Sequence, residues 1–257
     1  MIGIFDSGSG GLSVFREVFK LLPREKYVYF SDNAHCPYGE KSREQIIARA
    51  RTITDFLINE GCSIVVVACN TATAAAISTL RDEYSIPFVG MEPAVKPAAL
   101  ATKTGVIGVL ATAGTLKASK YLDTRDRYSD GITVKEHVGS GFVELVEAGM
   151  LDGPETEATV RASVQPLLDA GADIIVLGCT HYPFLRPVIE RIAGPEVTVI
   201  DPAPAAARHL LDVMQQKGLI GQDNADADPS DPGTAAIELH ASGSSDSLHR
   251  IFRLLGN

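Results

Sequence analysis

The sequence has no apolar run approaching the roughly 20 residues that a membrane-spanning helix requires. Its first residues, Met1 to Asp6, show no basic segment ahead of an apolar one, so we expect no signal peptide. These two absences favour a cytoplasmic protein without a membrane partner.

Cysteine and basic residues are also scarce. The four cysteines include no CxxC pair and no His/Cys cluster, which argues against a zinc site, and a reducing compartment disfavours disulfides. The 23 lysines and arginines are outnumbered by 32 acidic residues, and the net charge of −9 argues against a nucleic-acid partner. An anionic ligand would therefore need local donors that work against the field of the whole chain.

What the chain does contain is a regular alternation of strand-length apolar runs with helical segments. Such runs are typical of strands buried on both faces of a parallel sheet, and their helical connections predict an α/β fold. We expect two doubly wound, flavodoxin-like lobes with mainly parallel sheets, related by pseudo-symmetry. Strands are predicted at residues 2–5, 27–30, 64–68, 86–89, 106–110, 132–138, 174–178, 197–200 and 237–240.

The two predicted lobes divide the chain unevenly. Residues 1–94 together with 205–257 are expected to form the first lobe and residues 95–204 the second, with crossovers at 92–97 and 201–204. An active site is expected between the lobes. Residues 222–233 combine clustered turn formers with low hydrophobicity, which predicts a mobile surface loop.

Two segments share one pattern: an aliphatic run, a small residue, a cysteine and a polar pair. They place Cys69 and Cys179 at the carboxyl ends of strands, where open α/β sheets bind ligands. Each cysteine precedes a predicted helix whose macrodipole favours the thiolate, so we expect both thiols to have a lowered pKa. Two thiols facing one pocket can act as base and conjugate acid in a 1,1-proton transfer next to a carboxylate.

Other polar residues adjoin these strand ends, and each has two interpretations. Asp6 either caps the helix after the first strand or contacts Cys69 or a substrate ammonium. His181 is either a structural histidine or an acid–base partner of Cys179. Glu147, on a helix predicted at 141–149, either faces solvent or enters the site.

The glycine-rich turn at residues 8–11 lies between a predicted strand and an amphipathic helix. Such a turn lets backbone N–H groups approach an anion. It lacks the spacing of a dinucleotide fingerprint, so nucleotide binding is disfavoured. Of the remaining cysteines, Cys62 is expected to be an inert core residue, whereas Cys36 is either a core residue or a neighbour of the site.

In these segments the chain resembles the glutamate racemases, the cofactor-independent branch of the Asp/Glu racemase superfamily. The matching pieces occur in the family's order and span nearly the whole chain. They are Phe5-Asp6-Ser7-Gly8-x-Gly10-Gly11, Asp32 with Pro37-Tyr38-Gly39, Ala68-Cys69-Asn70-Thr71-Ala72, Met91-Glu92-Pro93 and Gly178-Cys179-Thr180-His181-Tyr182-Pro183.

The resemblance implies a role for the matching residues. Cys69 and Cys179 would be the catalytic thiols, assisted by Asp6 on one side and by Glu147 and His181 on the other. No metal or other cofactor is implied. The residues lining the glutamate would be Asp6, Ser7, Tyr38, Gly39, Asn70, Thr71, Thr180 and His181, with Thr112 and Thr115 as further carboxylate donors.

The implied reaction interconverts L-glutamate and D-glutamate, and D-glutamate would supply peptidoglycan synthesis and hence cell-wall biogenesis and cell shape. The implied assembly is a homodimer. Aspartate or another acidic amino acid stays open as the substrate, because one methylene in a pocket discriminates only roughly 10–200-fold. A two-lobed protein that binds an acidic metabolite without catalysis also stays open. A related decarboxylase or isomerase is disfavoured because both thiols are present.

Overall fold

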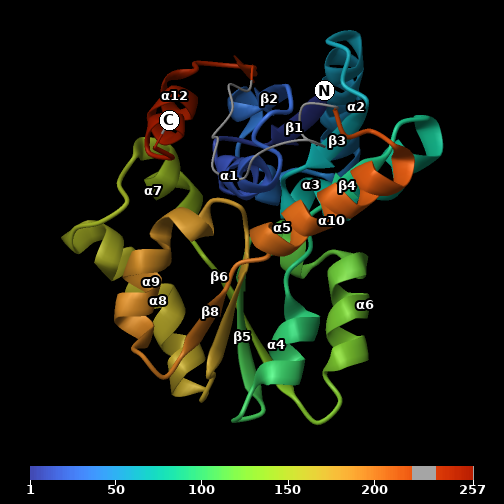
Figure 1. Ribbon diagram of the computed structural model, residues 1–257. Coiled ribbons are helices and arrows are strands. Elements are labelled where there is room, and N and C mark those ends of the chain that lie inside the picture. Colours follow the sequence, from blue (N-terminus) through green and yellow to red (C-terminus); the bar gives the residue numbers. More distant parts are fainter. Residues whose placement is uncertain (222–235, 257) are drawn as a thin grey trace.

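The strands of this protein form two separate sheets. A computed structural model describes residues 1–221 and 236–256 and is drawn as a ribbon in Figure 1. The first sheet contains β1 (Ile2–Asp6), β2 (Tyr27–Ser31), β3 (Ile64–Val67), β4 (Phe88–Gly90) and β9 (Ile237–Ala241). The second sheet contains β5 (Val106–Ala111), β6 (Thr133–Val138), β7 (Ile174–Gly178) and β8 (Thr198–Ile200).

The two sheets repeat one strand order. The first runs β4-β3-β1-β2-β9 and the second β6-β5-β7-β8, with every pairing parallel. In each sheet the first strand in the chain lies between the second and the third. Doubly wound sheets of this order bind ligands between their first and third strands, where the winding reverses. That place belongs to β1 and β3 in one sheet and to β5 and β7 in the other.

Helices cover both faces of each sheet (Figure 1). On the first sheet α2 and α3 cover one face, and α1 packs with α10 on the other. On the second sheet α4 and α6 cover one face, and α8 packs with α9 on the other. Their bounds are α1 (Leu12–Leu21), α2 (Arg43–Asn59), α3 (Asn70–Glu83), α4 (Val95–Ala101), α6 (Ser119–Tyr128), α8 (Pro154–Asp169), α9 (Arg186–Ala193) and α10 (Ala203–Lys217).

Shorter elements lie near the carboxyl ends of the strands. They are α5 (Ala113–Leu116), α7 (Phe142–Ala148), α12 (Asp246–Arg253) and the 3-10 turns η1 (Asn33–His35), η2 (Tyr38–Glu40) and η3 (Tyr182–Leu185). In Figure 1, α7 and α12 are neighbours at one side of the molecule. Among the described residues, none of the helices has both the length and the apolar character needed to cross a membrane.

A shared apolar core joins the two sheets. Ile4 on β1 and Phe15 on α1 belong to the same buried cluster as Ile175 on β7 and Val188 on α9. Packing of this kind removes apolar surface from water at roughly 25 cal/mol per Å². This shared core therefore fixes the position of the carboxyl ends of one sheet's strands relative to those of the other sheet.

The predicted α/β fold with two doubly wound, mainly parallel sheets is confirmed. The strand predicted at 237–240 pairs with β2 in the first sheet, as expected. Residues 92–97, predicted as a crossover, lie between β4 of the first sheet and β5 of the second, and they include the start of α4, whose first turn tolerates Pro97 because no N–H is needed there. The predicted loop at 222–233 lies outside the described residues.

Candidate active site

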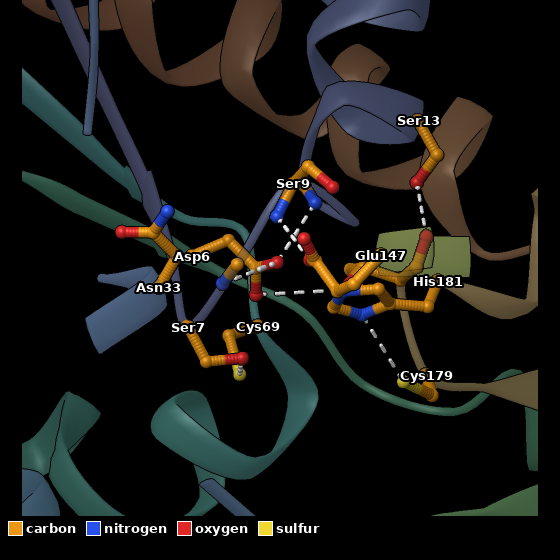
Figure 2. Close-up of polar contacts among 12 residues, drawn as sticks. Asp6, Ser7, Ser9, Ser13, Asn33, Cys69, Glu147, Cys179 and His181 are labelled. Atoms are coloured by element: carbon orange, nitrogen blue, oxygen red, sulfur yellow. Dashed lines mark hydrogen bonds and ion pairs between the residues drawn. The ribbon is translucent and has the colours of Figure 1, made fainter. Parts of the chain in front are cut away.

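Cys69 and Cys179 occupy equivalent positions in the two sheets. Cys69 follows β3 and is the N-cap of α3, whereas Cys179 follows β7 and precedes the 3-10 turn η3. β3 and β7 are the third strands of their sheets, so the repeated strand order brings each thiol to a ligand-binding edge. Both side chains are nearly buried, at 5% and 8% exposure. Figure 2 shows each thiol with its own set of polar neighbours.

Two hydrogen bonds and burial determine the protonation of the Cys69 thiol. The backbone N–H of Ala72 donates to its sulfur at 3.4 Å, and the thiol donates to Ser7 Oγ at 3.8 Å. Burial nevertheless raises the pKa of Cys69 well above its ordinary value, and the nearby charge of Asp6 adds to the rise. The expected lowering of this pKa by the helix N-terminus is therefore wrong, because one N–H donor does not offset desolvation.

Cys179 has a histidine as its partner. Its sulfur lies 3.8 Å from His181 Nδ1, and His181 Nε2 lies 2.7 Å from Glu147 Oε1 (Figure 2). Glu147 Oε1 also accepts a hydrogen bond from the backbone N–H of Ser9 at 2.7 Å. α7 brings Glu147 to this position, where its contacts with His181 and Ser9 favour the interpretation in which Glu147 enters the site.

His181 and Glu147 form an ionised pair. Burial alone would raise the pKa of Glu147, but the hydrogen bond and charge of His181 outweigh it and lower this pKa to about 2. Burial likewise opposes the charged form of His181, yet its contacts with Cys179 and Glu147 hold its pKa well above the ordinary value. His181 therefore holds a positive charge beside the sulfur of Cys179 at neutral pH, and the carboxylate of Glu147 balances this charge.

Asp6 links the two thiol environments. Its Oδ2 accepts hydrogen bonds from the backbone N–H groups of Gly8 at 3.3 Å and Gly11 at 2.9 Å. Its Oδ1 accepts a hydrogen bond from the Thr180 hydroxyl at 3.4 Å. The side chain is fully buried, and this burial raises its pKa. Because Thr180 follows Cys179, Asp6 contacts residues from both sheets.

The glycine-rich turn after β1 binds the protein's own carboxylates. Its N–H groups donate to Asp6 and Glu147. A Cβ at Gly8 would lie 2.3 Å from Glu147 Oε1, and a Cβ at Gly10 would lie 2.3 Å from His181 Nδ1. The expected anion cradle therefore exists, but the anions that it holds are side chains of this chain.

Three threonine hydroxyls form a second polar cluster. Thr71 Oγ1 lies 2.9 Å from Thr112 Oγ1 and 3.2 Å from Thr115 Oγ1, and the last two are 3.1 Å apart. Thr71 is in the first turn of α3, whereas Thr112 follows β5 and caps α5. The cluster therefore brings together hydroxyl groups that follow strands of both sheets.

The loop after β2 brings Tyr38 and Gly39 close to the threonine cluster. A Cβ at Gly39 would lie 3.0 Å from Thr112 Cβ, so this loop approaches the second sheet closely. The Tyr38 hydroxyl donates to Asp32 Oδ2 at 2.5 Å.

Asp32 also accepts hydrogen bonds from Arg49 at 2.8 and 3.0 Å, and this contact was not expected from the sequence. Arg49 lies on α2 outside every motif, so its role depends on the folded chain alone.

The side-chain amide of Asn70 is buried and, within the described part of the chain, unpaired. Its side chain is 3% exposed, yet neither amide atom has a hydrogen-bond partner among the described residues. Buried polar groups are normally paired, so this amide beside Cys69 is available to a ligand. A small pocket is lined by Asn70 and Thr115, and neither Cys69 nor Cys179 is among the residues that line it.

The two remaining cysteines have different surroundings. Cys62 is buried in the core beside the first sheet, as expected. Cys36 is half-buried, and its sulfur lies within 4.8 Å of ligand atoms of Glu147 and His181. Cys36 is therefore a neighbour of the site rather than a core residue.

Comparison with known proteins identifies the family. A profile of the Asp/Glu/Hydantoin racemases matches residues 2–210. The chain is 44% identical to "Glutamate racemase" of Stutzerimonas stutzeri (strain A1501) over 255 residues, which cover 99% of this chain and 93% of that protein.

Two solved structures have the same fold along almost the whole chain. Glutamate racemase isoform RacE1 from Bacillus anthracis superposes with a TM-score of 0.86 at 33% identity, covering 100% of this chain and 94% of that chain. Glutamate racemase from Francisella tularensis in complex with D-glutamate superposes with a TM-score of 0.81 at 27% identity, covering 99% and 92%. Together with the paired thiols, these matches show that the chain belongs to the Asp/Glu/Hydantoin racemase family and, within it, to the glutamate racemases.

Proposed function

We propose that this chain racemises glutamate by a two-thiol mechanism in which Cys69 and Cys179 exchange the proton on Cα. The observation that supports the mechanism best is the equivalent placement of two buried thiols at the third strands of two similar sheets. Glutamate as the substrate is supported by the relatives, one of which was solved with D-glutamate bound.

The proton balance of the mechanism closes without a cofactor. One thiolate removes the Cα proton from one face of glutamate, and the electron pair remains on the carbanion next to the carboxylate. The opposite thiol donates its proton to the other face, which yields the mirror-image centre. The first sulfur is then a thiol and the second a thiolate, and proton exchange with solvent restores the starting state.

The two thiols have different assistants in this proposal. Asp6 and Ser7 adjoin Cys69, and burial raises the pKa of this thiol, which favours its protonated form. His181, held by Glu147, adjoins Cys179 and supplies positive charge when that sulfur is the base. The catalytic assignment of Asp6, His181 and Glu147 is supported by these contacts.

The substrate contacts follow from the donors that surround the thiols. The threonine cluster of Thr71, Thr112 and Thr115 is suited to one carboxylate, and the unpaired Asn70 amide to another polar group. The further contacts that we propose are Asp6, Ser7, Tyr38, Gly39, Thr180 and His181. Local donors are needed because the net charge of −9 repels an anion.

The wider setting is proposed from the family. D-glutamate would supply peptidoglycan synthesis in the cytoplasm, and the enzyme would act as a homodimer. We also propose two lobes, residues 1–94 with 205–257 and residues 95–204. The lobes are supported by β9, which joins the first sheet, and by the separate second sheet. Light scattering that gives the mass of one chain would contradict the dimer.

The mechanism is tested by solvent deuterium incorporation at Cα. L- and D-glutamate are offered separately in D₂O without added cofactor, and NMR follows deuterium while circular dichroism follows configuration. Because different thiols remove and donate the proton, early deuterium should enter the product enantiomer rather than the remaining substrate. We expect Cys69→Ser and Cys179→Ser each to abolish racemisation, whereas the matched Cys62→Ser variant remains active.

Two outcomes would overturn parts of the proposal. Binding of glutamate without exchange or inversion would favour an acidic-metabolite binding protein. Racemisation that survives loss of either thiol would exclude the two-thiol mechanism. L-aspartate is offered in parallel, and turnover equal to that of glutamate would remove the substrate assignment while leaving the mechanism intact.

A further inference from the structure

Cys36 is the thiol near the site that the proposed mechanism does not use. Its sulfur, a carboxylate oxygen of Glu147 and a ring nitrogen of His181 lie within 4.8 Å of one another. All three atoms face Gly8. A Cβ built on Gly8 would lie 3.2 Å from Cys36 Sγ, 3.1 Å from His181 Nε2 and 2.3 Å from Glu147 Oε1.

These three groups are the ligand types that thiophilic divalent cations prefer. Zinc binds thiolate sulfur, imidazole nitrogen and carboxylate oxygen at about 2.0–2.3 Å, usually in tetrahedral geometry. Three protein ligands leave a fourth position for water. Ligand atoms in such a site are about 3.5 Å apart, so the present spacing requires shifts of about 1 Å.

The surroundings would orient two of the three ligands. The backbone N–H of Ser9 donates to Glu147 Oε1 at 2.7 Å and fixes the carboxylate. His181 Nδ1, the ring nitrogen opposite the one that would bind a cation, faces Cys179 Sγ at 3.8 Å. Metal sites in proteins typically hold a ligating histidine through its opposite ring nitrogen and give a ligating carboxylate a further hydrogen bond.

A cation can reach the cluster from solvent. An open pocket is lined by Cys36 and Glu147 and also by two further acids, Glu144 and Asp246. Arg250 lies in the same lining, where its guanidinium donates to the backbone carbonyl of Ala148 at 2.7 Å, and the three acids of the lining outnumber this one cation. The acidic lining and the net charge of −9 favour cations at this opening.

We propose that Cys36, His181 and Glu147 form a binding site for a thiophilic divalent cation such as Zn²⁺ or Cd²⁺, and that its occupation inhibits racemisation. The thiol proton of Cys36 and the Nε2 proton of His181 both pass to solvent when the metal–sulfur and metal–nitrogen bonds form. Coordination takes His181 Nε2 away from Glu147 and ends the support that this pair gives to Cys179. The inhibition rests on the proposed function, whereas the binding does not.

Binding is tested on the resting enzyme with Cd²⁺ alone, because a cadmium–thiolate bond absorbs in the ultraviolet. We expect one equivalent of Cd²⁺ to produce this absorption in the unmodified protein and in Cys62→Ala, the matched control. Cys36→Val should lose it, and Cys36→Ser, which keeps the size of the side chain, should lose it as well. Far-ultraviolet circular dichroism confirms that each variant is folded.

Inhibition is tested by racemisation of glutamate in the presence of Zn²⁺. We expect the inhibitory concentration to rise at least about tenfold in Cys36→Val, as loss of a metal ligand or its support generally costs. Absorption that persists in Cys36→Val would place the metal on Cys69 or Cys179 and overturn the proposal. Absence of both absorption and inhibition in the unmodified enzyme would also overturn it. An inactive enzyme that still binds Cd²⁺ through Cys36 would overturn only the proposed function.

Discussion

Glycine after β1 is required by packing rather than by backbone conformation. Neither Gly8 nor Gly10 has a positive φ, so another residue could adopt the same backbone. The space beside them is instead filled by the His181–Glu147 pair. His181 follows β7 and Glu147 lies on α7, which follows β6, so both belong to segments next to the second sheet. A side chain at either position would push the pair away from the sulfur that it supports.

The change Gly10→Ala tests this packing. Its Cβ would lie 2.3 Å from His181 Nδ1, so we expect overpacking to lower the free energy of unfolding by about 1–3 kcal/mol. Displacement of the imidazole should lower kcat by roughly 100-fold. Urea unfolding and steady-state kinetics measure the two effects.

Ser9→Ala is the matched control in the same turn. The Ser9 hydroxyl is buried without a partner, while its backbone N–H, which binds Glu147, is retained. Removal of an unpaired hydroxyl should leave stability and kcat nearly unchanged. Equal losses in the two variants would show that the turn is merely intolerant of change.

The helix α7 depends on α12 for its C-terminal end. The guanidinium of Arg250 on α12 donates to the last carbonyls of α7, those of Glu147 at 3.4 Å and Ala148 at 2.7 Å. Carbonyls at a helix C-terminus have no partner within the helix and favour a positive charge. α12 therefore helps to place Glu147, although it lies far along the chain from α7.

We expect Arg250→Met to weaken this placement without unfolding the protein. Methionine keeps the length of the side chain but loses both hydrogen bonds, so the free energy of unfolding should fall by about 1 kcal/mol. Kcat should fall by roughly tenfold because Glu147 shifts, with a smaller change in KM.

The exposed Arg253 on the same helix provides the control for this change. Arg253→Met should leave kcat unchanged. If both variants behave alike, charge on α12 and not the contact with α7 is responsible.

The two sheets also share electrostatic contacts, and these predict how stability depends on pH. The Glu147 pKa falls from about 4.3 in an unfolded chain to about 2 in the folded protein. The stability that it contributes is therefore present above about pH 4.3 and lost as the pH falls toward 2. The pKa of His181 is raised in the folded protein, so its dependence on pH is the reverse of that of Glu147. The stability that His181 contributes is fully present below about pH 6.5, and it is lost as the pH rises through the pKa of His181 in the folded protein.

Glu147→Gln tests the acidic half of this prediction. Near pH 6 the variant should be less stable by about 3 kcal/mol, since glutamine cannot balance the charge of His181. The difference should shrink as the pH falls, because a protonated Glu147 resembles glutamine. Urea unfolding at a series of pH values measures it.

Burial raises the pKa of Asp6, so Asp6 changes the free energy of unfolding with pH in the opposite direction to Glu147. Because Asp6 is present in both the unmodified protein and Glu147→Gln, its effect cancels in the difference between them. Glu144→Gln, on the exposed face of α7, serves as the control. A stability gap that is constant with pH would contradict the ionised pair.

The sequence alone was enough to predict the strands, their parallel arrangement and the two thiols at strand ends. These features depend on local patterns, because apolar runs and turn formers determine where strands begin and end. Arg49 could not be found in this way, since an arginine on a capped helix carries no signal of the buried Asp32 that it binds. The resemblance had placed Thr71, Thr112 and Thr115 at one ligand, whereas the hydrogen bonds among their hydroxyls are seen only in the folded chain.

By itself, then, the sequence determined the α/β class, the repeated thiol motif and the family that the motif indicates. Only the tertiary structure decided the electrostatic state of the site: a raised pKa at Cys69, an ionised pair at His181 and Glu147, and Cys36 beside that pair. The reason is physical. Secondary structure follows from neighbours along the chain, whereas desolvation and charge coupling follow from groups that folding brings together from distant positions.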